Sequence, residues 1–144
     1  MSIVRIIFFI TLFFNFNAYS DNSKCSLSEE RVTQTELNQH ADQDLKKVES
    51  ELDAVIKKIK KIYSGKIKFL TNLNKSQKNW ETQVILDLDL KFPETNKLMY
   101  YGSIFPMCYT MYKTELIRKR ITFLKEWLRV ANYTEVCSGS VQHE

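Results

Sequence analysis

Apolar residues recur every three or four positions from residue 37 to 62, and almost nothing in the chain interrupts a helix. The 144 residues include only three glycines and two prolines. Steps of three and four place apolar side chains on one face of an α-helix, close to the seam of a heptad repeat. Because glycine and proline are the strongest breakers of regular structure, their scarcity favours few, long helices. The pattern predicts an all-α protein whose first helix ends near residue 62, with Thr33 or Thr35 as its cap.

Similar spacing predicts two further long helices. The turn signal Ser64-Gly65 ends the first helix, and a second follows over about residues 66–92, where Phe92-Pro93 ends it. A third is expected over about residues 109–131, after one long connection over 91–108. Because the first join is short, the first two helices are expected to form a hairpin. The predicted fold class is all-α: an antiparallel bundle of three long helices with one long loop before the last helix.

The first twenty residues have the composition of a secretory signal peptide. A positive charge precedes the apolar run 6–16, and Ala18 and Ser20 put small residues at the −3 and −1 positions of a cleavage site. The run is shorter than the roughly 20 residues that a membrane helix needs. We expect cleavage between Ser20 and Asp21, so that the chain meets the membrane only through its signal peptide. Residues 21–144 then form a single helical domain.

Charge is distributed unevenly along the chain. Residues 29–54 hold eight acids against three bases, whereas residues 55–79 hold eight lysines and no acid. The protein is therefore expected to carry an acidic and a basic region. Export removes most nucleic acid as a partner, and the isoleucines among the lysines keep helical spacing, so a solvated lysine face is expected. Binding of the lysine-rich end to an anionic surface stays an alternative.

The sequence shows no pattern for catalysis, a cofactor or a metal. It has no Gly-rich phosphate loop and no Ser-His-Asp pattern, and acids two apart, such as Asp42 and Asp44, diverge on a helix. The cysteines of the exported chain, Cys25, Cys108 and Cys137, are far apart in sequence, and there are only two histidines. We expect a protein that is not an enzyme and has no cofactor.

The stretch 98–107 is the exception among otherwise helical segments. It is aromatic and has Gly102-Ser103 at its centre. Tyrosine gives rigid contact area and Ser/Gly give adaptable hydrogen bonding, which suits recognition of a partner. The alternative is that its apolar side chains plug the end of the bundle, and both roles stay open. The candidate partner-binding residues here are Tyr101, Gly102, Ser103 and Phe105, and the candidates for the plug are Tyr100, Ile104, Phe105 and Met107.

Three short motifs stand in a fixed order. They are Thr33-Gln34-x-Glu36-Leu37-Asn38-x-x-Ala41, Leu73-x-x-Ser76-Gln77-x-x-Trp80 and Tyr101-Gly-Ser-Ile-Phe-Pro-Met107, the last followed by Thr114-Glu-Leu116. In this order and spacing they resemble the lysozyme inhibitor LprI family, a helical domain of exported bacterial proteins. The resemblance covers residues 33–128.

The resemblance implies a periplasmic binding protein that inhibits lysozyme by occluding its active-site cleft. The helical scaffold is expected to present either a loop or an acidic face to the enzyme. Because animal lysozymes of the common type are cationic, the acidic residues 29–54, with Glu36 and Asp42 among them, are the better electrostatic partner. The alternative is a structural or interaction module of the envelope without anti-lysozyme activity.

The resemblance also bears on the cysteines. The family commonly has a cysteine where His40 stands, and Cys25 is its implied mate, which leaves Cys25 for Cys137 or Cys108. We favour Cys25–Cys137, which joins the two tails, and Cys25–Cys108 stays open. Either bond closes a loop of more than 80 residues, worth about 4–5 kcal/mol in the chain-entropy model. The odd cysteine is left over or links two chains as a disulfide-linked dimer.

Overall fold

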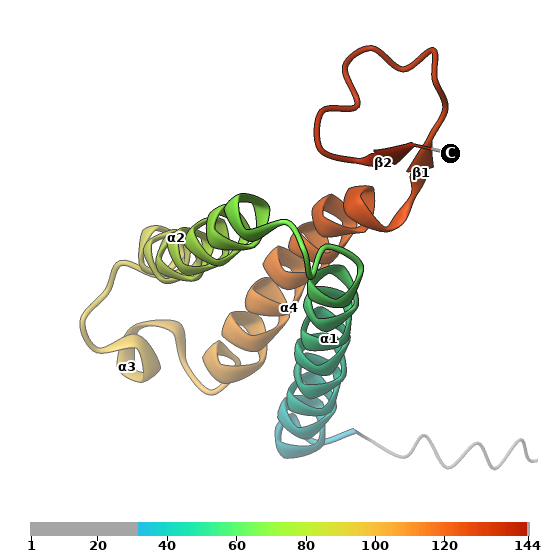
Figure 1. Cartoon of the computed structure of the whole chain (residues 1–144). Coiled ribbons are helices and arrows are strands. Elements are labelled where there is room, and N and C mark those ends of the chain that lie inside the picture. The colour runs from blue at the N-terminus through green and yellow to red at the C-terminus, as the bar shows by residue number, and fades with distance from the viewer. Residues whose placement is uncertain (1–31, 144) are drawn as a thin grey trace, which may run out of the picture. The chain divides into compact units, whose positions relative to one another are not determined.

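The computed structural model describes residues 32–143, and helices dominate them (Figure 1). The elements are α1 (Gln34–Ile62), α2 (Ile67–Lys91), α3 (Lys97–Tyr101), α4 (Phe105–Leu124), the 3-10 helix η1 (Lys125–Leu128), β1 (Val130–Ala131) and β2 (Gln142–His143). The predicted all-α class is confirmed at this level. In the described part of the chain, no helix is both long and apolar enough to span a membrane. The predicted signal peptide, its cleavage between Ser20 and Asp21, and Cys25 lie outside the described residues.

Helix α1 begins at a capping box. The Thr33 backbone N–H donates to Glu36 Oε2 at 2.6 Å, and the Glu36 backbone N–H donates to Thr33 Oγ1 at 3.3 Å. Two of the backbone donors that a helix start leaves unpaired are thus satisfied reciprocally. This confirms Thr33 as the cap. Farther along, the predicted apolar stripe is buried at Ala41, Val48, Leu52, Val55 and Ile59.

Helices α1 and α4 lie side by side and run in the same direction. Near the start of both, Thr110 Oγ1 donates to Asp42 Oδ1 at 3.3 Å. Farther along α1 and directly after α4, Lys125 Nζ donates to Glu51 Oε1 at 2.9 Å. The shared direction is the one that an up-down-up order of three helices requires.

Helix α2 runs the opposite way along α4. In its first half Ser76 accepts a hydrogen bond from Arg120 near the end of α4. After its last turn Phe92 packs against Phe105 at the start of α4, with ring centroids 5.3 Å apart. The α2–α4 pair is therefore antiparallel, as the sequence predicts for consecutive long helices.

A closed bundle of three helices is not confirmed, because α1 and α2 diverge after their turn (Figure 1). Between them lies a groove of about 430 Å³ with α4 residues at its base. Its lining includes Glu49, Leu52, Asp53 and Ile56 from α1, Trp80, Glu81, Val84 and Leu88 from α2, and Tyr109, Lys113 and Ile117 from α4. Apolar spacing reports which residues face inward, whereas crossing angles depend on how the side chains interdigitate. The predicted hairpin of the first two helices is thus closed only near its turn.

The core consists of two clusters along α4. One gathers around Ile59, Tyr63 and Leu124, all at most 1% exposed, where α1 ends and α4 ends. The other gathers around Leu88 and Phe92, where α2 ends and α4 begins. Each cluster therefore joins α4 to one end of another long helix.

The connection and the third helix differ from the prediction. Residues 91–108 include the short helix α3, and α4 already begins at Phe105 rather than near Tyr109. Pro106 occupies the first turn of α4, where its missing N–H has no helical partner to lose. At the other end, regular α-helix stops at Leu124 instead of continuing to Ala131.

The chain after η1 forms a closed tail. Strands β1 and β2 pair in parallel, with Val130 opposite Gln142 and Ala131 opposite His143. Ala131 and Val141 are buried, and Trp127 Nε1 donates to Ser140 Oγ at 3.0 Å. The tail is thus fastened to the end of α4 by apolar burial as well as by hydrogen bonds.

Candidate functional site

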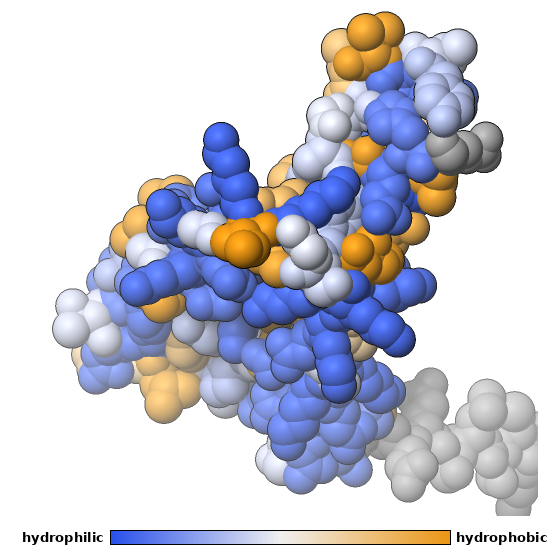
Figure 2. All heavy atoms as spheres, viewed as in Figure 1, coloured by the Kyte–Doolittle hydropathy of each residue, from blue (hydrophilic) through white to orange (hydrophobic). Residues whose placement is uncertain are grey.

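The segment between α2 and α4 presents exposed apolar side chains. We call residues 96–104 the α3 tip. Leu98, Met99 and Tyr100 are 60%, 83% and 68% exposed, and Ile104 is 47% exposed. Hydrophobic atoms are visible at this end of the molecule in Figure 2. Exposed apolar side chains that gather in one patch are typical of interaction sites.

The opposite side of the α3 tip is anchored by aromatic packing. Tyr101 packs edge-on against Phe92 at 5.5 Å and stacks on Phe105 at 5.7 Å between ring centroids. Phe92 is only 8% exposed. Aromatic pairs in these geometries contribute about 0.5–1.5 kcal/mol beyond the area that they bury. The base of the tip is therefore fixed by the second core cluster.

Local hydrogen bonds define the tip further. Asn96 Oδ1 accepts from the Met99 backbone N–H at 3.1 Å, which caps α3. Gly102 ends α3 with φ at +73°, a region that side chains disfavour, and its N–H donates to the Leu98 carbonyl at 2.9 Å. Lys97 Nζ donates to the carbonyl of Phe92. The tip is thus held at its start, at its end and to Phe92, the residue directly after α2.

These contacts divide the residues that the sequence left open between recognition and plugging. Tyr101 and Phe105 are half-buried and pack in the aromatic cluster. Met107 is also half-buried. Gly102 and Ser103 are exposed in the turn, and Tyr100 and Ile104 are exposed rather than plugging the bundle. The segment therefore has an anchored side and an exposed side that involve different side chains, and a role of Tyr101, Gly102, Ser103 and Phe105 in binding a partner stays a prediction.

Most acidic side chains of α1 have partners within the molecule. Glu36 belongs to the capping box, where the hydrogen bonds from Thr33 lower the pKa of its carboxyl group. Asp42 accepts the hydrogen bond from Thr110, and Asp44 accepts two from Arg118 Nη2 at 2.9 and 3.0 Å. The face of the N-terminal half of α1 that Figure 2 shows is mostly hydrophilic. A role of Glu36 and Asp42 in binding a partner stays a prediction, and their structural roles are evident.

The acid–base pairing continues up the same interface. Lys113 Nζ pairs with Glu49 Oε1 at 2.8 Å, and Lys125 Nζ pairs with Glu51 Oε1 at 2.9 Å. Much of the acidic charge of residues 42–51 is therefore neutralised by α4 and the residue after it. The acidic charge that the sequence concentrates in α1 is therefore used partly in ion pairs with α4 and Lys125, which leaves less of it to attract a partner.

The motif from Leu73 to Trp80 meets Arg120, a residue whose role was not apparent from the sequence. Arg120 donates from Nε to Gln77 Oε1 at 3.1 Å and from Nη2 to Ser76 Oγ at 3.0 Å. Its guanidinium carbon lies 5.5 Å from the centre of the Trp80 ring and 5.2 Å from that of Phe123. Gln77 and Trp80 of α2 therefore lie at a helix–helix contact with α4. The available signal was that residue 120 falls on the same helical face as the apolar residues three before and four after it.

Arg120 is 7% exposed and forms no ion pair with any carboxylate among residues 32–143. Burial lowers the pKa of its guanidinium group from the usual value, and the negative charge of Glu81 opposes this shift. An arginine side chain nonetheless stays charged in a protein. The molecule therefore holds one positive charge between α2 and α4 with neutral direct partners.

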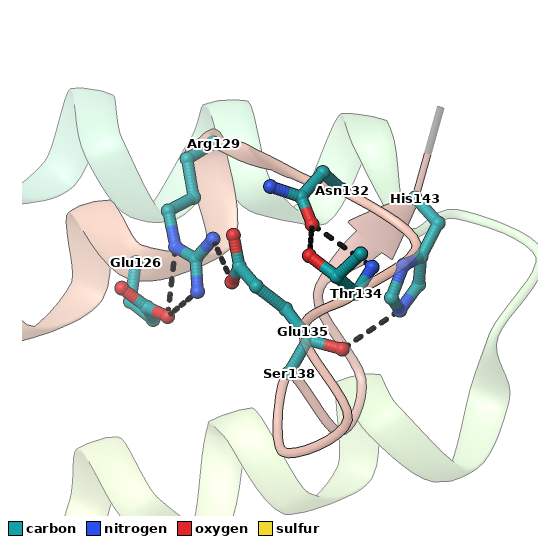
Figure 3. Close-up of polar contacts among 7 residues, drawn as sticks. All are labelled: Glu126, Arg129, Asn132, Thr134, Glu135, Ser138 and His143. Atoms are coloured by element: carbon teal, nitrogen blue, oxygen red, sulfur yellow. Dashed lines mark hydrogen bonds and ion pairs between the residues drawn. The ribbon is translucent and has the colours of Figure 1, made fainter.

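The tail is ordered by polar contacts that Figure 3 shows. Arg129 donates from Nη2 to Glu126 Oε1 at 2.6 Å and from Nη1 to Glu135 Oε2 at 2.7 Å. These hydrogen bonds raise the pKa of Arg129 and lower that of Glu126. Asn132 Oδ1 accepts from the Thr134 backbone N–H at 2.9 Å. The network closes the loop between β1 and β2.

One further contact of the tail involves residue types found in catalytic sites. Ser138 Oγ and His143 Nε2 lie 2.7 Å apart (Figure 3). A catalytic serine also needs a group that orients the histidine. No carboxylate of the described residues bonds to His143, and His143 is exposed. We interpret the pair as part of the tail's hydrogen bonding.

Cys108 and Cys137 lie at opposite ends of α4 and do not bond to each other. Cys108 is half-buried in the first turn of α4, and Cys137 is exposed in the tail. The predicted partner Cys25 is outside the described residues, so the pairings Cys25–Cys137 and Cys25–Cys108 stay predictions. Within residues 32–143, no group of three His, Cys, Asp or Glu side chains is arranged to hold a metal ion.

Comparison with known proteins supplies the family. The family model described as lysozyme inhibitor LprI matches residues 25–124. No curated protein and no solved structure matches the chain. The match covers α1, α2, α3 and α4 and includes all three sequence motifs. Since it spans more than half of the chain, this protein belongs to the lysozyme inhibitor LprI family.

Proposed function

We propose that this protein is exported to the periplasm and inhibits lysozyme by binding across its active-site cleft through the α3 tip. The family supports lysozyme as the partner. The observation that carries the choice of surface is the contrast within the tip. Leu98, Met99 and Tyr100 are exposed, whereas Tyr101 beside them is packed on Phe92.

This arrangement matches the physical needs of a cleft-binding surface. Residues that dominate protein interfaces are commonly aromatic or apolar anchors, and they bind best when their geometry is fixed before contact. The cap at Asn96, the turn at Gly102 and the aromatic base fix the tip without covering its outer side. Tyr100 supplies a hydroxyl and Ser103 another, both exposed and suited to hydrogen bonds with the enzyme.

The acidic face of α1 is the less favoured surface. Its carboxylates Asp44, Glu49 and Glu51 are already paired with basic side chains, so their attraction for a cationic enzyme is reduced. Glu36 and Asp42 stay candidates for a supporting contact, since both are exposed. The exposed apolar side chains of the α3 tip, by contrast, form no ion pairs that a partner would have to replace.

The test is an assay of lysozyme turnover with the purified exported chain. We expect inhibition by the native sequence and at least a tenfold loss of inhibition in the variant Met99→Ser/Tyr100→Ala. Because both side chains are largely exposed, the thermal unfolding of this variant should match that of the native protein. The matched control is Tyr133→Ala, which removes an 81% exposed tyrosine from the tail and should leave inhibition unchanged.

Two outcomes would contradict the proposal at different levels. Failure of the native chain to inhibit any lysozyme type at micromolar concentration would remove lysozyme inhibition itself. Inhibition that survives in the tip variant, but is lost when Glu36 and Asp42 are replaced by glutamine and asparagine, would move the binding surface to α1.

An envelope interaction module without anti-lysozyme activity is the second candidate. The observation in its favour is the exposed thiol of Cys137, which an oxidising compartment could use to link two chains. Electrophoresis of periplasmic material without reductant distinguishes the two. A disulfide-linked dimer that disappears on Cys137→Ser, together with no inhibition, would favour this candidate.

A further inference from the structure

A second feature of the molecule lies at the other end of α2 from the α3 tip. A pocket of about 590 Å³ opens between the start of α2, the end of α4 and the tail. Phe69, Leu73, Phe123 and Trp127 form its apolar walls. Pockets of roughly 300–1,000 Å³ with mostly apolar walls and a few polar groups are typical of small-molecule sites.

The charged residues of this pocket are all positive. Lys66 and Lys68 line it, and no aspartate or glutamate does. The two lysines belong to residues 55–79, which include no acid. In Figure 2 hydrophobic atoms near the start of α2 are surrounded by hydrophilic ones. An occupant with an apolar body and a negative group would match both properties.

A second, independent source of positive potential lies behind the pocket wall. Ser76 lines the pocket and accepts a hydrogen bond from the buried Arg120, whose ring neighbour Phe123 also lines it. Glu81 accepts a hydrogen bond from Gln77 and lines the groove between α1 and α2 rather than this pocket. Arg120 therefore adds a positive charge behind Ser76 and Phe123, whereas no carboxylate lines the pocket itself.

Polar groups are available for the head of such an occupant. Asn72, Ser76 and Ser140 line the pocket with an amide and two hydroxyls. Lysine ammonium groups and these donors suit a carboxylate, whereas the aromatic walls suit a hydrocarbon chain.

We propose that this pocket binds a single-chain anionic amphiphile of the fatty-acid type. The hydrocarbon chain lies against Phe69, Phe123 and Trp127, and the carboxylate lies near Lys66 and Lys68. The site is separate from the α3 tip and from lysozyme binding, so it stands or fails independently of the proposed function.

The experiment titrates dodecanoate into the purified exported chain below the micelle-forming concentration and follows heat and tryptophan fluorescence. We expect saturable binding of one dodecanoate, with at least tenfold weaker binding of the neutral dodecanol and of the cationic dodecylamine. Lys66→Gln/Lys68→Gln should weaken dodecanoate binding by tenfold or more. The matched control Lys57→Gln/Lys58→Gln removes the same charge from exposed positions outside the pocket and should change the affinity by less than twofold.

A second measurement places the ligand. In a Trp80→Phe variant, 11-bromoundecanoate should quench the fluorescence of the remaining Trp127, and circular dichroism verifies that the variant is folded. Absence of saturable binding, equal affinity for dodecanol and dodecanoate, an equal loss in the two lysine variants, or unquenched Trp127 in the folded variant would each overturn the proposal.

Discussion

Basic residues of helix α4 have charged partners on α1 and neutral partners on α2. Towards α1 it presents Lys113 and Arg118, which pair with carboxylates of α1 at 2.8 and 2.9 Å. Towards α2 it presents Arg120, which is 7% exposed and meets an amide, a hydroxyl and two aromatic rings. Basic residues of one helix, only a few positions apart, thus form partly exposed ion pairs on the side of α1 and a buried, neutral set of contacts on the side of α2.

The difference teaches which contacts determine stability and which determine alignment. The side chains of the α1–α4 pairs are between 33% and 55% exposed, so water competes for each charge. Exposed ion pairs contribute only about 0–1 kcal/mol each, though several in a row still favour one register. Arg120 is only 7% exposed, so water competes much less for its charge. Without it, Gln77 and Ser76 would lose a hydrogen-bond donor and Trp80 would lose a packing partner. We therefore expect the two interfaces to respond very differently to substitution.

The largest effect is expected for Arg120→Ala. The variant loses packing against Trp80 and Phe123, leaves a cavity and deprives Gln77 of its donor. We expect a loss of about 2–4 kcal/mol in the free energy of unfolding, measured by urea denaturation. Arg120→Met should lose less, because it retains volume and removes the buried charge together with its desolvation cost.

Arg118→Ala on the same helix is the matched control for that experiment. It removes the same side chain from the α1 interface, where it is 55% exposed, and should cost less than about 1 kcal/mol. Equal losses from Arg118→Ala and Arg120→Ala would show that the contrast between the two interfaces has no energetic basis.

A smaller loss is expected at the aromatic end of the α2–α4 interface. Phe105→Ala removes a half-buried ring that packs on Phe92 and Tyr101, and we expect a loss of about 2–3 kcal/mol. Tyr100→Ala, next to the same cluster but exposed, should change the free energy of unfolding by less than about 0.5 kcal/mol. Urea denaturation of both variants checks this. A cost at Tyr100 that equals the cost at Phe105 would mean that the tip's outer side is structural.

Local patterns in the sequence predicted the helices well, because helix formation depends on nearby residues. The cap at Thr33 with Glu36 and the buried stripe from Ala41 to Ile59 follow from spacing alone. The divergence of α2 from α1 did not follow, because a crossing angle depends on side chains far apart in sequence. The strands of the tail also depend on such contacts, since β1 and β2 are two residues long and pair across the intervening loop.

For the candidate site, the sequence identified the segment 98–107, but it did not show which of its side chains are anchored and which are exposed. Tyr101 and Phe105 became the anchored side only because Phe92, beyond the end of α2, lies beneath them. Arg120 was missed because a charged residue within a helical stripe is normally read as solvent-facing. Its neutral partners on α2 become evident only when α2 and α4 are brought together.

The smallest effect is expected for one ion pair of the α1–α4 interface. A double-mutant cycle with Asp44→Asn and Arg118→Gln should give a coupling energy of about 0.5 kcal/mol at low salt. Both side chains are about half exposed, so 1 M NaCl, where the screening length falls to roughly 3 Å, should reduce the coupling to near zero. The cost of Arg120→Ala should change little between the same two salt concentrations, because that side chain is only 7% exposed. A salt-insensitive coupling at Asp44 and Arg118 would mean that this ion pair is shielded from solvent as Arg120 is. Urea denaturation of the four proteins of the cycle and of Arg120→Ala at both salt concentrations therefore tests the exposed ion pair and the buried arginine against each other.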